Sequence, residues 1–430
     1  MTCHVGKATQ DDPPVLHAAI GLTEQIKEAS NAAEAERRLP PSVATAMQEA
    51  GVFGIVMPRA WGGPELDPLT QIRVIEALAM ADGSAGWCAM IGCDSGYVSA
   101  FLDQSVARAM YPDRLVATGA AATTTGEARR APGGYWVKRA VPVRQRLSSF
   151  RMGLARLHRR RGRGAARRTT MGYRKRGSAF CTCPNARSWT WYTTGVRGTG
   201  SNDLVVRDVF VPEERSFSFQ DPELIKRSGP LYAFPYMFIS KGPAPALGIA
   251  RRAIDTLIES AAGKLARRYT VGERVEPASV LRDDVYVQEA VGRAGTLLTS
   301  ARAHVFDVVG DFWASLVDGR QPSDRQMALF TTLYPHAVGA CVEVVQLIYK
   351  AEGGTAVYQR GPLDRCLRDI LKMNQHVVGT MRTYEMAGRL LLGLEPLRWL
   401  VLMADGRALR HLSGNPAGKQ IPLQFRCWAV

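Results

Sequence analysis

The stretch that decides the fold is QMALFTTLYPHAVGACVEVVQLIYKAEGG, residues 326–354, the third of four long runs with helical spacing of apolar residues. The other runs are ALGIARRAIDTLIESAA at 246–262, VYVQEAVGRAGTLLTSARAHVFDVVGDFWASL at 285–316 and PLDRCLRDILKMNQHVVGTMRTYEMAGRLLLG at 362–393. Only short breaks separate them. Four amphipathic runs in this order predict an antiparallel four-helix bundle over residues 230–396.

Two further regions precede this bundle. Residues 1–113 predict helices, among them the nearly all-apolar run WCAMIGCDSGYVSAFL at 87–102, which is typical of a buried helix. Residues 114–229 are rich in Thr, Gly and β-branched residues and predict a small β domain. We therefore expect an α+β fold that is mostly α: an N-terminal helical domain, a middle β domain, a C-terminal four-helix bundle and a tail at 397–430.

Composition excludes several classes of protein. The chain has 430 residues, of which 46% are hydrophobic, and we find no uninterrupted apolar run of the ~18–20 residues that a membrane span needs. The N-terminus has no apolar region typical of a secretory signal. The eight cysteines are scattered, and Cys181-Thr-Cys183 lacks the spacing of a zinc site. We expect reduced thiols, a cytoplasmic location and no metal.

The net charge of +16 comes from one segment. Between Lys138 and Thr190 there are 14 Arg and 2 Lys and no Asp or Glu, and without them 39 basic residues face 39 acidic ones. An arginine-rich arm could bind nucleic acid. However, residues 138–190 interrupt the β domain, and since they show almost no alternation of apolar and polar residues, we expect them to supply no strands with an apolar face and to leave that domain disrupted.

A shifted reading frame is the interpretation that we favour for this segment. Displaced frames of GC-rich genes encode mainly Arg, Ala, Gly and Pro, as here. The codons permitted for residues 142–147, read one nucleotide later, allow Pro-Phe-Gly-Ser-Gly. If the shift is real, the middle of this β domain is lost, although both helical domains can still form.

Five motifs in order resemble the acyl-CoA dehydrogenase superfamily, which contains a Trp-Pro-Phe-x-Ser-Gly stretch at the place of that segment. The motifs are PRAWGG at 58–63 with ELDP after it, IEALAMADGSAGW at 75–87, TGVRGTGSNDLVVRDVFVPEE at 194–214, AEGGTAVYQRGPLDRCLRD at 351–369 and NQHVVGTMRTYEMAGRLLLG at 374–393. The resemblance implies the helical, β and four-helix order expected above.

Within that superfamily, one residue separates two chemistries. Most dehydrogenases take a proton from an acyl-CoA with the Glu of a Tyr-Glu-Gly-Thr turn near the end of the chain. The matching turn here is Val377-Val378-Gly379-Thr380, and valine cannot accept a proton. Glu385 would need a different helix register to substitute. An acyl-CoA dehydrogenase is therefore the alternative to the second branch.

The second branch is the oxygenase component of two-component flavin monooxygenases, whose Gln-His motif resembles Asn374-Gln375-His376. The resemblance implies a catalytic His376 beside a reduced flavin (FMN or FAD), an aromatic or polycyclic substrate, a separate flavin reductase and a homotetramer. On one continuous helix, Arg365, Asp369, Lys372 and His376 would share a face.

Other candidate site residues follow from the same resemblance. Many relatives carry a His in the buried helix after Trp87, where this chain has Asp94, which we consider as an acid or base, or else as a helix cap or a surface residue. The implied cofactor-binding residues are Arg197, Ser201, Gly353, Gly354, Arg368 and Asp369, with Gly353 and Gly354 serving a neighbouring subunit. Each of these residues also has a purely structural explanation. Arg197 and Ser201 belong to a loop, Gly353 and Gly354 end a helix, and Arg368 and Asp369 can form an ion pair at an interface. An inactive or nucleic-acid-binding relative is the third alternative.

Overall fold

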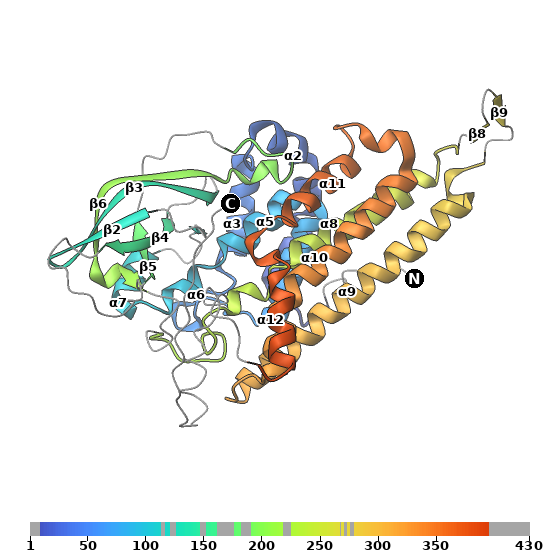
Figure 1. The fold of residues 1–430 in the computed structure, drawn as a ribbon. Coiled ribbons are helices and arrows are strands. Elements are labelled where there is room, and N and C mark those ends of the chain that lie inside the picture. Colours follow the sequence, from blue (N-terminus) through green and yellow to red (C-terminus); the bar gives the residue numbers. More distant parts are fainter. Residues whose placement is uncertain are drawn as a thin grey trace, which may run out of the picture.

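The structure, a computed structural model, describes residues 9–112, 117–120, 126–146, 152–160, 176–181, 191–217, 225–266, 268–270, 273–275 and 279–394. Three regions follow each other along the chain (Figure 1). The N-terminal helices are α1 (Pro14–Gly21), α2 (Thr23–Glu36), α3 (Pro41–Glu49), α4 (Pro68–Ala81), α5 (Gly83–Gly92), α6 (Ser95–Ser99) and α7 (Gln104–Met110). The predicted tail at 397–430 lies outside the described residues.

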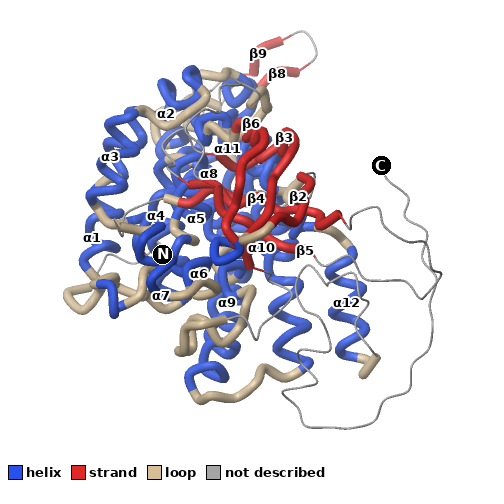
Figure 2. Tube along the Cα trace, turned by 90° about the vertical axis from the view of Figure 1, so that its left-hand side faces the viewer, coloured by secondary structure: helices blue, strands red, loops and turns tan. Residues whose placement is uncertain are grey.

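The middle region is a seven-stranded sheet of order β6-β3-β2-β4-β5-β7, with β1 paired to β4. Its strands are β1 (Thr118–Ala120), β2 (Gly126–Ala131), β3 (Gly134–Arg146), β4 (Met152–Arg160), β5 (Arg176–Cys181), β6 (Asn202–Pro212) and β7 (Ser216–Phe217). The antiparallel β3–β6 pair places Tyr135 opposite Val211, which joins the two segments that predicted strands. The sheet appears in red in Figure 2.

Strands also form inside residues 138–190, while the expectation that these strands lack an apolar face stays a prediction. β3 continues to Arg146, and β4 and β5 both lie inside the arginine-rich segment. β4 pairs antiparallel with β5 and parallel with β1 and β2. A strand ladder is held by backbone hydrogen bonds, so its formation does not require the alternation on which that expectation depended.

The C-terminal region is the predicted bundle, with its fourth helix broken in two. Its helices are α8 (Ala244–Ala261), α9 (Val285–Val317), α10 (Asp324–Glu352), α11 (Pro362–Met373) and α12 (Arg382–Leu391). A small hairpin of β8 (Arg268–Thr270) and β9 (Glu273–Val275) lies between α8 and α9. Ser323 and Gln326 form a reciprocal capping box that starts α10, and Gly353 with φ of 74° ends it.

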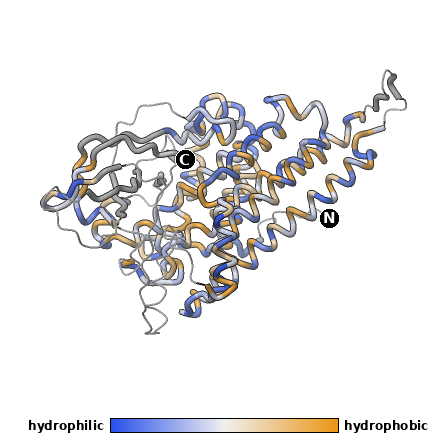
Figure 3. The backbone as a smooth tube through the Cα atoms, in the orientation of Figure 1, coloured by the Kyte–Doolittle hydropathy of each residue, from blue (hydrophilic) through white to orange (hydrophobic). Residues whose placement is uncertain are grey.

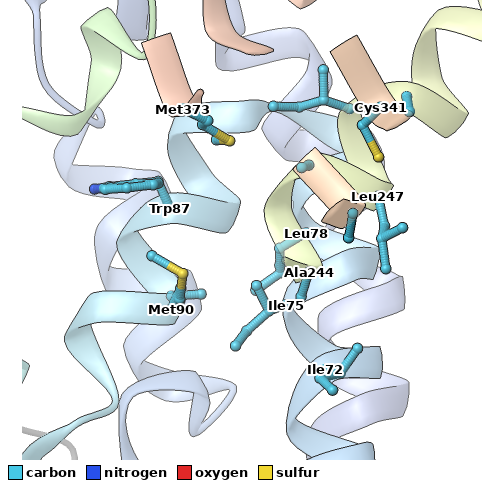
Figure 4. Packing of buried hydrophobic residues seen from close by; sticks show 14 of the residues in the cluster. Ile72, Ile75, Leu78, Trp87, Met90, Ala244, Leu247, Cys341 and Met373 are labelled. Atoms are coloured by element: carbon cyan, nitrogen blue, oxygen red, sulfur yellow. The ribbon is translucent and has the colours of Figure 1, made fainter. Parts of the chain in front are cut away.

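One apolar core joins the N-terminal helices to the bundle. It includes Ile72 and Leu78 on α4, Trp87 on α5, Leu247 on α8 and Cys341 on α10 (Figure 4). The backbones of α4 and α8 approach closely at Gly248. A Cβ at this position would lie only 2.5 Å from the backbone oxygen of Glu76. The sheet and the bundle therefore lie on either side of a fixed helical layer that contains α5 (Figure 1).

The apolar residues of the bundle gather on its inner faces (Figure 3). Among the described residues, the segment Asp324–Val357 is long and apolar enough to cross a membrane by length and composition, and 61% of its most apolar window is buried inside the protein. Packing of α10 against α8, α9, α11 and α12 accounts for that composition.

Candidate functional site at the end of helix α11

His376 lies in a turn just after α11. The helix ends at Met373, and the backbone N–H of His376 donates to the carbonyl of Met373 at 2.9 Å. The N–H of Gly379 in turn donates to the carbonyl of His376 at 2.8 Å, which starts the short 3₁₀ helix Val377–Gly379. The expected helical face therefore stops at Lys372, and His376 is placed by turn geometry rather than by helical spacing.

Two aromatic rings enclose the imidazole of His376. The ring of Trp87 on α5 meets it edge to face with centroids 5.3 Å apart, and the ring of Tyr334 on α10 lies 5.5 Å away. The Tyr334 hydroxyl donates to the carbonyl of Met373 at 2.9 Å, so the same tyrosine fixes the end of α11. Trp87 and Met373 belong to one apolar cluster (Figure 4).

These surroundings keep the imidazole neutral. Burial and, to a smaller extent, the ammonium of Lys372 together lower the pKa of His376 to about 4. At pH 7 the ring therefore offers one N–H donor and one acceptor nitrogen, and carries no charge. Such a ring can donate one hydrogen bond and accept another beside a bound aromatic group.

Trp191 is a second wall of the site, and the sequence analysis did not single it out. Lys372 Nζ lies 5.4 Å from the centroid of the Trp191 ring, so Trp191 and His376 are both neighbours of one lysine. The Trp191 ring N–H donates to the carbonyl of Val196 at 3.0 Å, and its backbone N–H donates to Asn202 Oδ1 at 3.1 Å. Trp191 lies three residues before the motif that begins at Thr194, and that position was the available signal in the sequence.

The residues at this end of α11 fit a flavin. A flavin ring is flat and apolar on its faces and polar at its edges, and the tryptophan, tyrosine and neutral imidazole side chains match that character. Thr380 adds a buried hydroxyl that makes no hydrogen bond within the described part of the chain. Trp87, Trp191, His376 and Thr380 are the side chains that would hold the ring system of a bound flavin.

Arg197 and Arg368 meet at a single carboxylate, that of Glu34 on α2. Arg197 Nη1 lies 3.0 Å from Glu34 Oε1, Arg365 Nε lies 3.0 Å from Glu34 Oε2, and Arg368 donates to Oε1 as well. Arg368 also donates to the Thr194 carbonyl at 2.8 Å. The structure thus brings these two predicted residues together, as part of an ion-pair network inside one chain.

Asp369 holds the loop that leads from Trp191. Its Oδ1 accepts a hydrogen bond from the N–H of Val196 at 2.5 Å, and Val196 has a left-handed backbone with φ of 43°. Burial and the nearby carboxylate of Asp82 raise the pKa of Asp369. A Cβ on Gly195 would lie 2.0 Å from the Arg368 carbonyl, so only glycine permits this approach. The contacts of Arg368 and Asp369 hold neighbouring segments of the chain in place, and a cofactor-binding role of the two residues stays a prediction.

The other predicted cofactor residues are Ser201, Gly353 and Gly354. Ser201 is buried, with its Oγ 2.8 Å from Thr199 Oγ1. Gly353 and Gly354 are exposed at the end of α10, and the whole length of α11, 12 residues or about 18 Å, separates them from the His376 turn. Within one chain they do not line the imidazole, and their predicted contact with a neighbouring subunit is untested.

Asp94 forms a buried ion pair that the sequence analysis missed. Its Oδ1 accepts from Lys241 Nζ at 2.5 Å, and Lys241 also donates to the Phe238 carbonyl at 3.0 Å. Burial raises the pKa of Asp94, while the ammonium of Lys241 opposes that rise. Asp94 makes no side-chain capping bond to α6, so the helix-cap interpretation is wrong. A single lysine before a predicted helix carries no pattern that would have indicated this pair.

The carboxylate expected of a dehydrogenase is not at the turn. Val378 is half-buried within the 3₁₀ helix that follows His376. Glu385 is exposed on α12, a helix that begins after the turn. The structure therefore presents an imidazole, and no glutamate from these two positions, to Trp87 and Tyr334.

Comparisons with known proteins agree with this arrangement. Residues 242–380 match the model of the acyl-CoA dehydrogenase C-terminal domain, and residues 21–105 match that of the N-terminal domain. An indole-3-acetate monooxygenase of Pseudomonas putida is 30% identical over 84% of this chain and 89% of its own length. The flavin-dependent monooxygenase oxygenase subunit HsaA of Mycobacterium tuberculosis is 26% identical over 90% of this chain and 97% of its own length.

Solved structures show the same likeness. The HsaA monooxygenase of Mycobacterium tuberculosis superimposes with a TM-score of 0.78 at 25% identity, covering 89% of this chain and 98% of its own. A 3-HSA hydroxylase of Rhodococcus superimposes with a TM-score of 0.80 at 24% identity, and this likeness shows the fold alone. The chain belongs to the acyl-CoA dehydrogenase superfamily, in the branch whose relatives are named as oxygenase components of flavin-dependent monooxygenases.

Proposed function

We propose that this protein is the oxygenase component of a two-component flavin monooxygenase, which uses reduced flavin and O₂ to hydroxylate an aromatic or polycyclic small molecule. One observation carries the proposal. A neutral imidazole, His376, occupies the turn between Trp87 and Tyr334, while Val378 stands where dehydrogenases have their catalytic glutamate.

The chemistry of the site supports this assignment. Reduced flavin, when bound, supplies the electrons for the activation of O₂. The chain's own task is to bind the ring, keep water from it and provide hydrogen-bonding groups beside it. His376 can hold one proton and accept a hydrogen bond at its ring nitrogens, since burial leaves it uncharged. Trp87, Tyr334 and Trp191 supply apolar surface around it.

The relatives support an aromatic substrate. They are named for indole-3-acetate, for resorcinol and, in one case, for p-hydroxyphenylacetate, all of which are aromatic. The resorcinol enzyme is named as an FADH₂-dependent oxygenase component, so a separate reductase would supply the reduced flavin. We extend both features, the aromatic substrate and the separate reductase, to this chain.

We also propose that the protein is a cytoplasmic homotetramer. Apolar side chains are exposed along the 3₁₀ turn and α12, with Met381 77% and Leu392 76% exposed and Val377 and Tyr384 beside them, and a second copy of the chain would bury them. Four described cysteines, Cys88, Cys93, Cys341 and Cys366, are free and buried, which suits a reducing compartment.

The deciding experiment separates flavin binding from chemistry. Purified protein is titrated anaerobically with dithionite-reduced FMN and FADH₂, and the loaded protein is then mixed with O₂ and an aromatic probe such as resorcinol. We expect uptake of one reduced flavin per chain and a hydroxylated product by mass spectrometry, both lost in His376→Ala. Reduction of a bound flavin by octanoyl-CoA would instead establish a dehydrogenase, and steeply salt-dependent retention of RNA would favour the nucleic-acid alternative.

A further inference from the structure

Polar pairs line the outer edge of the contact between the antiparallel helices α9 and α10. Toward one end, Arg293 Nη2 on α9 donates to Glu343 Oε1 on α10 at 2.7 Å. Toward the other end, Gln326 Nε2 on α10 donates to Ser315 Oγ on α9 at 2.8 Å. In both pairs the partners are complementary, one a cation and an anion, the other a donor and an acceptor.

His304 on α9 and His336 on α10 form the pair between these two. Arg293, His304 and Ser315 follow one another at intervals of 11 residues, or about three helical turns, so they share one face of α9. The two imidazole rings meet at 71°, with their centroids 4.7 Å apart. Within the described residues, neither ring makes a hydrogen bond. This pair alone of the three therefore has ring nitrogens available to a ligand.

A small ligand can reach this pair from solvent. The side chain of His336 is exposed, and that of His304 is half-buried. His336 and the buried Tyr334, two residues earlier, point about 200° apart around α10, so the pair is separate from the site around His376. Burial and His336 lower the pKa of His304, while the carboxylate of Asp307 opposes that shift, so the His304 ring is neutral at pH 7.

Two imidazoles at this separation match the coordination of one metal ion. A Zn²⁺–nitrogen bond is about 2.0–2.1 Å long, and neighbouring ligands around a four- to six-coordinate ion then have ring centres roughly 4.5–5 Å apart. The observed 4.7 Å falls within that range. Imidazole suits Zn²⁺, Ni²⁺ and Cu²⁺, whereas Mg²⁺ and Ca²⁺ prefer oxygen ligands. The described residues contain no group of three or more His, Cys, Asp or Glu that could hold a metal, so water would complete the coordination.

We propose that His304 and His336 form a binding site for one divalent transition-metal ion, which takes one ring nitrogen from each residue and joins α9 to α10. Coordination uses the lone pair of each neutral ring, so no covalent bond breaks and no electron is transferred. With two protein ligands, the ion exchanges with solvent. The site departs from the expectation of no metal, because two histidines 32 positions apart on separate helices form no motif in the sequence.

The test is isothermal titration calorimetry of the full chain with Ni²⁺ and with Mg²⁺ at pH 7.5, without an affinity tag and after removal of metals with EDTA. We expect one Ni²⁺ ion per chain with micromolar affinity and no binding of Mg²⁺, since the ligands are nitrogens. Failure to bind Ni²⁺, or binding of Mg²⁺ as tight as that of Ni²⁺, would overturn the proposal. The titration needs neither flavin nor O₂, so its result is independent of the proposed oxygenase function.

Single variants assign the ion to these two rings. His304→Asn and His336→Asn each remove one ligand and should weaken Ni²⁺ binding at least about tenfold. The control His17→Asn removes an exposed histidine on α1, whose Nε2 lies 3.0 Å from the Thr9 carbonyl oxygen, and should bind Ni²⁺ as wild type does. Equal affinity of His336→Asn and wild type contradicts the assignment. If His304→Asn fails to fold, the exposed position 336 still decides the question.

Discussion

Replacing His376 by Gln should remove a pH-dependent loss of stability. In the unfolded chain a histidine has an ordinary pKa of 6.5, whereas burial and Lys372 lower the pKa of His376 to about 4 in the folded protein. Between these values the unfolded state binds a proton that the folded state refuses. Acidification from pH 7.5 to pH 5 therefore favours the unfolded chain by 1.5 pKa units, or about 2 kcal/mol at 1.36 kcal/mol per unit.

The measurement is urea unfolding of wild type and His376→Gln at both pH values, followed by tryptophan fluorescence. All other titrating groups are common to the two proteins, so the difference between their pH effects isolates His376. We expect wild type to lose about 2 kcal/mol more than the variant on acidification. Lys372→Met should reduce that excess only in part, because burial is the larger cause of the shift. An equal loss in wild type and His376→Gln would refute the buried, neutral imidazole.

Three further predictions concern the ion-pair network and the basic segment. Burial and Asp82 raise the pKa of Asp369, so the wild-type chain loses stability as the pH rises above 3.8, the ordinary pKa of this carboxyl group in the unfolded chain. The free energy of unfolding of Asp369→Asn, measured in urea, should therefore rise relative to that of wild type between pH 4 and pH 8. Glu34→Gln leaves three arginines without their shared carboxylate and should lower stability by about 3 kcal/mol in urea unfolding, whereas the exposed control Glu24→Gln should leave it nearly unchanged. Sequencing the gene across codons 138–190 should reveal a one-nucleotide displacement that restores Pro-Phe-Gly-Ser-Gly near residue 142; an intact frame that encodes the same arginines in related strains contradicts the shift.

Helical periodicity predicted the order of the elements but not where α11 stops. No Gly or Pro separates Pro362 from Val378, so the sequence continues as one helix by pattern. In the structure, the Tyr334 hydroxyl donates a hydrogen bond to the carbonyl of Met373, and the chain turns there. That bond joins residues 39 positions apart, and spacing within a segment contains no information about it. The family resemblance nevertheless selected His376, because it depends on residue identity and not on helix phase.

Contacts between distant segments account for what the sequence could not predict at the site. Asp369 receives the N–H of Val196 from 173 positions away, and Lys241 reaches Asp94 across 147 positions. Neither pair belongs to a motif with fixed spacing. In contrast, the absence of a catalytic glutamate was readable directly, since Val378 is a single residue in a recognisable turn. Chemistry carried by one position was predictable, and chemistry carried by a pair was not.

Helix α11 connects the two walls of the proposed flavin site. Its C-terminal end places His376, while Asp369, one turn earlier, holds the loop after Trp191 through Val196. Trp191 is further fixed by Arg37 on the N-terminal side, whose Nη1 donates to the Trp191 carbonyl at 3.0 Å. Every residue in this linkage lies outside 138–190. The relative position of imidazole and indole is therefore set by the helical regions and the 191–202 loop, and a change confined to the basic segment should leave the acid sensitivity of His376 as it is, even where it abolishes flavin binding.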